Sequence, residues 1–213
     1  MPAIVKRLLP LVGLLYLIGG LEGIEVARQR RRLNRAASGL ASAETDRDPG
    51  PASAPTDRDP ASYRLLALTW WPAGHAAIAA ALIVPQLNVG QAWRQRCLFG
   101  GIGLSLLGVA LRQWAIATLG RFFVGHVLVQ SDQHVITDGP YRWLRHPSYT
   151  GIWLEMVGVG ASTGNILGAL VCLIVPLVGI VARIEGEEHE LGASLPGYGD
   201  FARQRARLVP GVW

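Results

Sequence analysis

Charged side chains are scarce in this sequence of 213 residues. Only 16% of the residues are charged, 50% are hydrophobic, and the mean hydropathy is +0.29. This balance is too apolar for an ordinary soluble domain, so it argues against that class and favours an integral membrane protein. The 26 glycines agree with this class, because glycine lets the backbones of membrane helices approach closely.

Cysteine is almost absent. Cys97 and Cys172 each lie in or beside an apolar stretch, without a CxxC pair or a neighbouring histidine cluster. Neither a disulfide framework nor a metal site is expected, and both cysteines are interpreted as reduced packing residues.

Lysine is nearly missing as well, since Lys6 is the one lysine beside nineteen arginines, and the formal net charge is +5. The arginines cluster between apolar stretches, which is typical of loops near anionic lipid headgroups. The bilayer is therefore expected as their partner, and nucleic acid is not. Arginine in place of lysine, with much alanine, glycine and proline, suggests a GC-rich coding sequence and a bacterial cytoplasmic membrane.

Five apolar stretches predict an all-α fold with about five membrane helices, at about 8–24, 65–87, 98–119, 151–162 and 166–182. About 20 helical residues cross a hydrocarbon core of ~30 Å, and the first three stretches are long enough. The last two are shorter and separated only by Thr163, Gly164 and Asn165, which predicts a tight helical hairpin. The first stretch follows a basic start like a signal peptide, but it lacks a convincing cleavage site and is expected to be retained.

The basic residues predict the orientation. With the N-terminus outside, only Lys6, Arg7, Arg94 and Arg96 of the twenty basic residues lie outside, so the positive-inside rule favours a cytoplasmic C-terminus. The chain is then divided into an N-terminal membrane helix (1–27), an arginine-rich disordered cytoplasmic linker (28–64), two membrane helices (65–119) and a C-terminal region (120–213).

Polar and aromatic residues concentrate from Asp138 to Gly151, at the entry to the fourth stretch. Gly139-Pro140 indicates a turn, and Pro147 suits the first position of a helix, whose amides would attract an anionic group. An interfacial belt of aromatic residues and snorkelling arginines is an equally simple interpretation of this segment.

A second polar cluster, from Arg183 to Leu191, follows the last apolar stretch. Arg183 and Glu187 are four residues apart and share a helix face, so a solvated face held by this pair is the simplest explanation. The hairpin, however, returns this segment to the membrane face of His146. Two polar clusters on one face predict a ligand site.

Residues 111–213 resemble the isoprenylcysteine carboxyl methyltransferase family, whose relatives include phospholipid methyltransferases. The resemblance rests on Gly-x-Tyr-x-x-x-Arg-His-Pro-x-Tyr-x-Gly at 139–151, Arg-Ile-x-x-Glu-Glu-x-x-Leu at 183–191 and Arg-Leu-Val-Pro at 207–210. It implies that residues 120–213 form a methyltransferase core with a loop, the hairpin and a C-terminal cytoplasmic helix. S-adenosylmethionine would bind at the cytoplasmic face, and a lipophilic acceptor would enter from the bilayer.

The resemblance also assigns roles. The catalytic residues would be Arg183, which orients the acceptor carboxylate with its planar fork of donors, and Tyr198. Glu187 would accept from the ammonium group of the cofactor. A carboxylate is ionised at neutral pH, so methyl transfer to it needs alignment more than acid or base. The full cofactor-binding set would be Gln130, His134, Val135, Ile136, Tyr141, His146, Pro147, Ser148, Tyr149, Glu187 and Glu188.

Two features set this chain apart from that pattern. Phe201 stands where the family often has a second tyrosine, which removes a hydroxyl. Glu155 is a charge inside the fourth stretch and is a functional candidate by default, although it could simply pair with an arginine.

Alternatives stay open. Membrane reductases of sterol-like or fatty substrates carry a similar Arg-His-Pro-x-Tyr string with NADPH as cofactor, although they usually have Asn where Ser148 stands. A non-enzymatic membrane scaffold or small transporter is the other alternative. The acceptor is most simply the carboxylate of a prenylcysteine-like or other isoprenoid lipid, and an amine or hydroxyl also fits. The sequence does not predict the oligomeric state.

Overall fold

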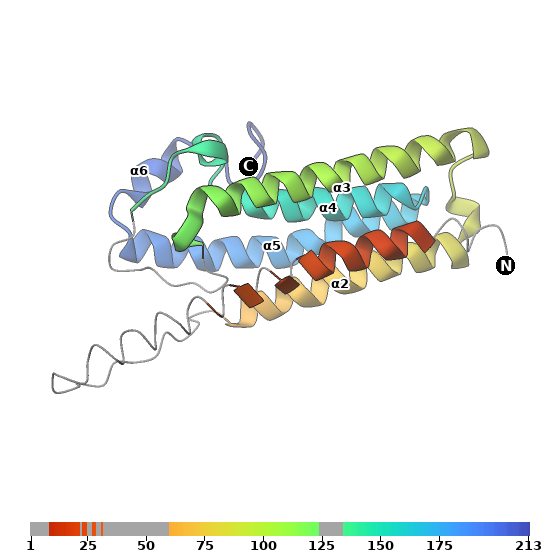
Figure 1. Ribbon diagram of the computed structural model, residues 1–213, viewed down its shortest axis with the longest axis horizontal. Helices are drawn as coiled ribbons and strands as arrows, with labels where there is room; N and C mark the ends of the chain where they lie inside the picture. Colours follow the sequence, from red (N-terminus) through yellow and green to blue (C-terminus); the bar gives the residue numbers. More distant parts are fainter. Residues whose placement is uncertain (1–8, 22, 25–26, 29–30, 32–59, 124–133) are drawn as a thin grey trace.

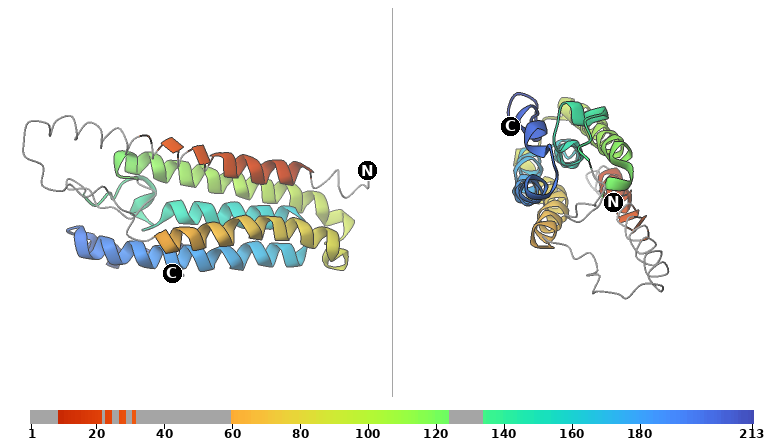
Figure 2. Two further views of the ribbon diagram at one scale, coloured as in Figure 1. Left: turned by 90° about the horizontal axis from the view of Figure 1, so that it is seen from below. Right: turned by 90° about the vertical axis from the view of Figure 1, so that its left-hand side faces the viewer.

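The computed structural model describes residues 9–21, 23–24, 27–28, 31, 60–123 and 134–213. Its long helices run side by side along the longest axis (Figures 1 and 2): the N-terminal helix Leu9–Leu21, α2 (Pro60–Ile83), α3 (Gln91–Leu119), α4 (Pro147–Ser162) and α5 (Ile166–Ser194). Short helices connect or follow them: η1 (Pro85–Leu87), η2 (Gly120–Phe122), η3 (Gly139–Arg142) and α6 (Tyr198–Arg203). The described residues form no strand beyond isolated bridges, so the predicted all-helical class is confirmed.

Three of the described helices are long and apolar enough to cross a membrane: Ala61–Ile83 within α2, all of α3 and all of α5. The N-terminal helix is apolar but shorter, and α4 has 16 residues. The predicted number of about five membrane helices is therefore not confirmed. Many large apolar side chains remain exposed on the bundle, as expected where lipid covers them; examples are Leu68, Phe99, Leu106, Leu107, Ile174 and Val178.

The hairpin between α4 and α5 turns where the sequence predicts. α4 ends at Ser162 and α5 begins at Ile166, with Gly164 at a φ of 64°, a conformation that suits glycine. Asn165 caps α5, because its Oδ1 accepts a hydrogen bond of 2.9 Å from the amide of Gly168. At its other end α5 extends beyond the last apolar stretch. It continues without a break to Ser194, so the second polar cluster lies on the same helix as the last apolar stretch.

Small residues hold α3 and α4 unusually close. A Cβ atom added at Gly108 would lie 2.6 Å from the carbonyl oxygen of Gly151, and one at Gly101 would lie 2.5 Å from that of Gly158. Ser105, between these glycines on α3, donates a hydrogen bond of 2.9 Å to the backbone oxygen of Glu155. Such close backbone contact is typical of helices that associate in lipid, where small residues replace hydrophobic burial as the basis of packing.

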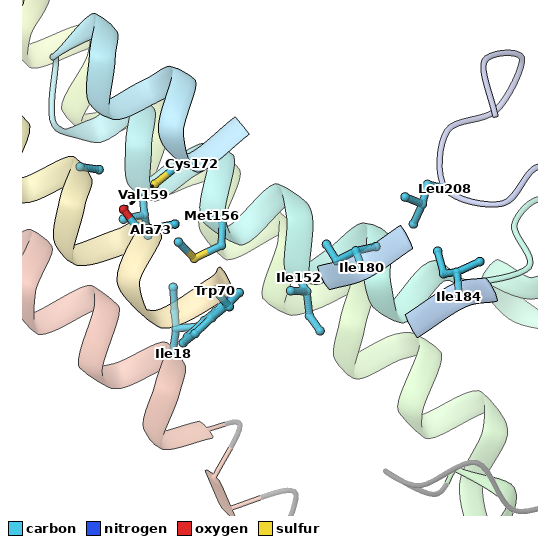
Figure 3. Close-up of a cluster of buried hydrophobic side chains, with 11 residues drawn as sticks. Ile18, Trp70, Ala73, Ile152, Met156, Val159, Cys172, Ile180, Ile184 and Leu208 are labelled. Atoms are coloured by element: carbon cyan, nitrogen blue, oxygen red, sulfur yellow. Dashed lines mark hydrogen bonds between the residues drawn. The ribbon is translucent and has the colours of Figure 1, made fainter. Parts of the chain in front are cut away.

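The main apolar core lies between α2, α4 and α5 and also receives the N-terminal helix through Ile18 (Figure 3). Its centre is fully buried, with Met156 and Cys172 at 0% exposure. Figure 3 also shows Leu208 of the C-terminal tail beside Ile180 and Ile184 of α5. The core therefore extends along the bundle to the end at which the polar clusters lie.

The opposite end of the bundle carries a separate polar contact. The amide nitrogen Nδ2 of Asn165 donates to the backbone oxygen of Val84 at 3.1 Å and to Oδ1 of Asn88 at 2.8 Å. The backbone amide of Val89 donates to the oxygen of Gly164 at 2.8 Å. This far-end contact ties the α4–α5 turn to the connection between α2 and α3.

Candidate active site

The C-terminal tail pairs with the segment that enters α4. The backbone amide of Arg145 donates to the oxygen of Ala206 at 2.8 Å, and that of His146 donates to the oxygen of Arg207 at 3.2 Å. Leu144 and Ala206 form an isolated parallel bridge in the same place. The first and third motifs of the sequence are thus neighbours, because the tail returns over the start of α4.

Glu188 on α5 is the centre of an ionic cluster. Its Oε1 accepts from Nη1 of Arg145 at 3.0 Å and lies 3.1 Å from Nε2 of His146. Its Oε2 lies 3.0 Å from Nε and 2.9 Å from Nη2 of Arg207. Both carboxylate oxygens therefore already have cationic or imidazole partners, and Glu188 is a structural anchor. Its predicted contact with the cofactor stays a prediction.

Glu187 is the centre of the neighbouring group. Its Oε1 accepts a short hydrogen bond of 2.5 Å from the hydroxyl of Tyr149 and one of 3.2 Å from Nε of Arg183. Its Oε2 lies 3.7 Å from Nδ1 of His146, whose other ring nitrogen faces Glu188. The imidazole of His146 thus bridges two adjacent carboxylates, and the two motifs meet through these side chains.

Arg183 is almost completely buried, with a relative exposure of 1%. Its Nε donates to Glu187 and also to the hydroxyl oxygen of Tyr149, at 3.3 Å. Its Nη1 donates to the hydroxyl oxygen of Ser62, on the first turn of α2, at 3.1 Å. A buried guanidinium requires such partners, because an uncompensated buried charge is costly.

Ser148, on the first turn of α4, is hydrogen-bonded to α3. Nη1 of the buried Arg112 donates to its hydroxyl oxygen at 2.7 Å. Sequence reasoning did not include Arg112 or Ser62 in the site. A charged residue inside the apolar stretch 98–119 was an available signal for Arg112, whereas a lone serine at a helix start gave none for Ser62.

A second, mainly apolar cluster adjoins the charged residues. Tyr141 and Tyr198 are buried in it together with Ala115 of α3, and the predicted cofactor residues Val135 and Ile136 pack against it. Both phenols keep their protons. Burial first, and then the nearby carboxylate of a glutamate, raises the pKa of Tyr141 and of Tyr198 well above the ordinary value.

The hydroxyl of Tyr198 has no hydrogen-bond partner among the described residues. Its ring lies 5.8 Å from that of Phe201, the position where the second tyrosine of the family pattern is missing. A buried donor without a partner is rare in folded proteins and is suited to meet a polar group of a ligand. This observation supports the inclusion of Tyr198 in the candidate site.

The other predicted residues are more peripheral. Gln130 lies outside the described residues. His134 is exposed, with its ring 5.3 Å from that of Phe122. Pro147 is the first residue of α4, as predicted, and is buried. Glu155 is buried at the α3–α4 contact, away from the segment that enters α4, and its role stays a hypothesis.

The fold and the site together define a helical membrane protein with a compact ionic and aromatic site at one end of its bundle. Residues 101–193 match the model of the isoprenylcysteine carboxyl methyltransferase family, which confirms the resemblance seen in the motifs.

Protein relatives show the same likeness. The chain is 34% identical to protein-S-isoprenylcysteine O-methyltransferase B of Arabidopsis thaliana over 93 residues, which cover 43% of this chain and 47% of that protein. It is 32% identical to the nickel-cobalt-cadmium resistance protein NccN of Alcaligenes xylosoxydans xylosoxydans over 111 residues, or 51% of this chain and 52% of that protein. The chain thus spans about half the length of these curated relatives.

A solved structure agrees in fold. The structure of the eukaryotic intramembrane Ras methyltransferase ICMT is similar with a TM-score of 0.54 and 26% sequence identity, over 76% of this chain and 58% of that one. The likeness therefore extends beyond the segment that carries the motifs, into the helices that precede it.

Proposed function

We propose that this protein transfers a methyl group from S-adenosylmethionine to a carboxylate of a lipophilic, prenylcysteine-like acceptor at the cytoplasmic face of a membrane. The observation that carries the proposal is the direct contact between the two family motifs, in which His146 and Tyr149 meet Glu187 and Glu188. The match of residues 101–193 to the methyltransferase family supports the same reaction class.

The donor set fits the proposed cofactor. Its amino acid end carries an ammonium and a carboxylate, and the carboxylate of Glu187, 20% exposed, suits the first. Pro147 has no amide hydrogen, so Ser148 is the first residue of α4 whose amide can face an anion. The hydroxyl of Tyr198 offers a further donor beside the apolar side chains of Tyr141 and Ile136. When bound, the cofactor supplies an electrophilic methyl group on a sulfonium cation.

The residues of the chain would align the acceptor rather than move protons. An acceptor carboxylate is already ionised at neutral pH, and in-line displacement gains most from correct placement of the two reactants. The guanidinium of Arg183 would bind that carboxylate, with its plane held by Tyr149 and Glu187. Tyr141 and Tyr198 stay neutral because their pKa values are raised, so their hydroxyls can donate hydrogen bonds and their rings form apolar walls.

A lipophilic acceptor agrees with the position of the site in the bundle. α5 carries the apolar stretch and, without interruption, the ionic residues Arg183, Glu187 and Glu188. An acceptor with a long apolar chain could therefore keep that chain in lipid while its polar end reaches the site. The positive-inside rule supports the cytoplasmic face.

Binding of S-adenosylhomocysteine to detergent-purified protein, measured by calorimetry, is the direct test of the cofactor. Micromolar binding is expected, and the affinity should fall tenfold or more in Glu187→Ala. Glu185→Ala, a change at an exposed position of the same helix, is the matched control and should bind normally. Binding of a reduced nicotinamide cofactor in its place would instead favour the membrane reductase.

A transfer assay tests the acceptor. Methyl-labelled S-adenosylmethionine and N-acetyl-S-farnesylcysteine are expected to give a product whose label is released as methanol by base, as a methyl ester requires. If the protein binds S-adenosylhomocysteine but the labelled product is stable to base, the proposal of a methyltransferase stands and the proposal of a carboxylate acceptor fails.

A further inference from the structure

The contact between Ser62 and Arg183 connects the site to a part of the chain that the family match does not include. Ser62 lies on the first turn of α2, and the matched residues begin at 101. Nη1 of Arg183 donates to its hydroxyl oxygen at 3.1 Å, and the two side chains are 1% and 7% exposed. Neither motif nor match assigns a role to this serine.

The packing of α2 on α5 fixes the place of that hydroxyl. A Cβ atom added at Gly179, one turn before Arg183, would lie 2.6 Å from Cα of Leu66 and 2.4 Å from the hydroxyl oxygen of Thr69. Ser62, Leu66 and Thr69 are spaced by four and three residues, so they lie on one face of α2. Because this face touches the backbone of α5 directly, Ser62 cannot move along Arg183 without separation of the helices.

The guanidinium of Arg183 is thereby held from two sides. Tyr149 and Glu187 accept from Nε, at 3.3 and 3.2 Å, and Ser62 accepts from Nη1. A free arginine side chain has many rotamers, and the cost of ordering it falls on whichever ligand it binds. An arginine that is already ordered binds a carboxylate without that cost.

We propose that Ser62 is a positioning residue for the acceptor: its hydroxyl orients the guanidinium of Arg183, and Arg183 contacts the acceptor carboxylate. This inference rests on the proposed function. The effect of Ser62 is expected in acceptor binding, because its hydroxyl accepts from Arg183, the residue proposed to bind the acceptor carboxylate.

Kinetics of three variants test the role. Ser62→Ala is expected to raise the KM for N-acetyl-S-farnesylcysteine about 5- to 10-fold, a loss at the upper end of the range for an ordinary hydrogen bond. The affinity for S-adenosylhomocysteine should stay within about twofold. Ser62→Thr keeps a hydroxyl, so its KM should be close to that of the native protein. Thr69→Val is the matched control: it removes a hydroxyl whose described bonds are to Leu65 and Leu66 of its own helix, so the KM should not change.

The possible failures are distinguishable. If the native sequence neither binds S-adenosylhomocysteine nor transfers methyl groups, the proposed function fails and this inference with it. If the native sequence is active but Ser62→Ala has an unchanged or lower KM, only the role of Ser62 is overturned. An equal loss of acceptor and cofactor affinity would also overturn it, because that result indicates general disruption of the fold.

A thermal double-mutant cycle provides a measurement that needs no substrate. The effects of Ser62→Ala and Arg183→Lys on the midpoint of unfolding should be less than additive, since both break the same contact. Strict additivity would show that the two side chains are not coupled and would overturn the inference.

Discussion

Nε2 of His146 lies 3.1 Å from Oε1 of Glu188, and this contact joins two motifs through residues that are 42 positions apart in the chain. The same carboxylate also binds Arg145 and, through its other oxygen, Arg207. Glu188 therefore fastens the start of α4 and the C-terminal tail to α5. We therefore expect Glu188 to contribute mainly to the stability of the site.

Replacement of Glu188 by glutamine should destabilise the protein. The change removes the charge that compensates Arg145 and Arg207, and the free energy of unfolding should fall by about 2–3 kcal/mol. For a chain of this size that corresponds to a fall in the midpoint of thermal unfolding of roughly 4–12 °C. Glu185→Gln on the exposed part of α5 is the control, and an equal effect in both variants would contradict the anchoring role.

The hydroxyl of Tyr149 should matter for cofactor affinity. Tyr149→Phe removes the short hydrogen bond to Glu187, so the carboxylate that is proposed to bind the ammonium is less firmly oriented. The Kd for S-adenosylhomocysteine should rise about tenfold, as for the loss of one charge-assisted hydrogen bond. Tyr16→Phe, at an exposed tyrosine of the N-terminal helix, should bind like the native protein. Calorimetry would contradict the prediction if both variants bind equally well.

The close packing of α3 on α4 makes Gly108 sensitive to any side chain. Gly108→Ala would place a methyl group 2.6 Å from backbone atoms of Gly151 and Glu155, and the resulting strain should cost about 1–3 kcal/mol. Gly103→Ala on the same helix meets no atom within 4 Å and should be neutral or slightly stabilising, since alanine favours helix. Thermal unfolding of the two variants in one detergent provides the comparison. Similar midpoints would show that the helices can separate at little cost.

Tyr198 should contribute to the loss of stability in alkali. Burial, and then the negative charge of Glu188, raises its pKa in the folded protein above the ordinary value of 10. Its contribution to stability is complete below about pH 10 and declines as the pH rises, because the unfolded chain loses the phenolic proton first. In Tyr198→Phe the unfolding free energy should therefore fall less steeply above roughly pH 10, while the two proteins respond alike to pH near neutrality. Parallel curves over the whole range would show that Tyr198 is not protected in the folded state.

The sequence predicts local structure well wherever glycine, proline and asparagine limit the backbone. The turn at Thr163, Gly164 and Asn165 and the start of α4 at Pro147 both fall where these residues require them. The end of the last apolar stretch does not mark the end of the helix. Loss of hydrophobicity after Ala182 reflects a change in surroundings, and the helix itself continues to Ser194 because its backbone bonds do not depend on hydropathy.

The partners of polar residues on apolar helices were not predictable in this way. Ser62 and Arg112 contact Arg183 and Ser148 because of the rotation and register of α2 and α3. In helices that are apolar on most sides, the sequence has little periodicity from which that rotation could be read. The glycines of α3 indicate which face of that helix is in close contact, because close contacts require them. They do not indicate which helix the contact is with.

The far-end contact has a consequence for biosynthesis. Asn165 in the turn of the α4–α5 hairpin bonds to Val84 and Asn88, which lie in the connection between α2 and α3. A polar turn that reaches its final depth without these groups would have to be satisfied by water, at a cost that grows within lipid. Because α2 and α3 precede the hairpin in the chain, the groups that satisfy Asn165 are synthesised before Asn165 itself.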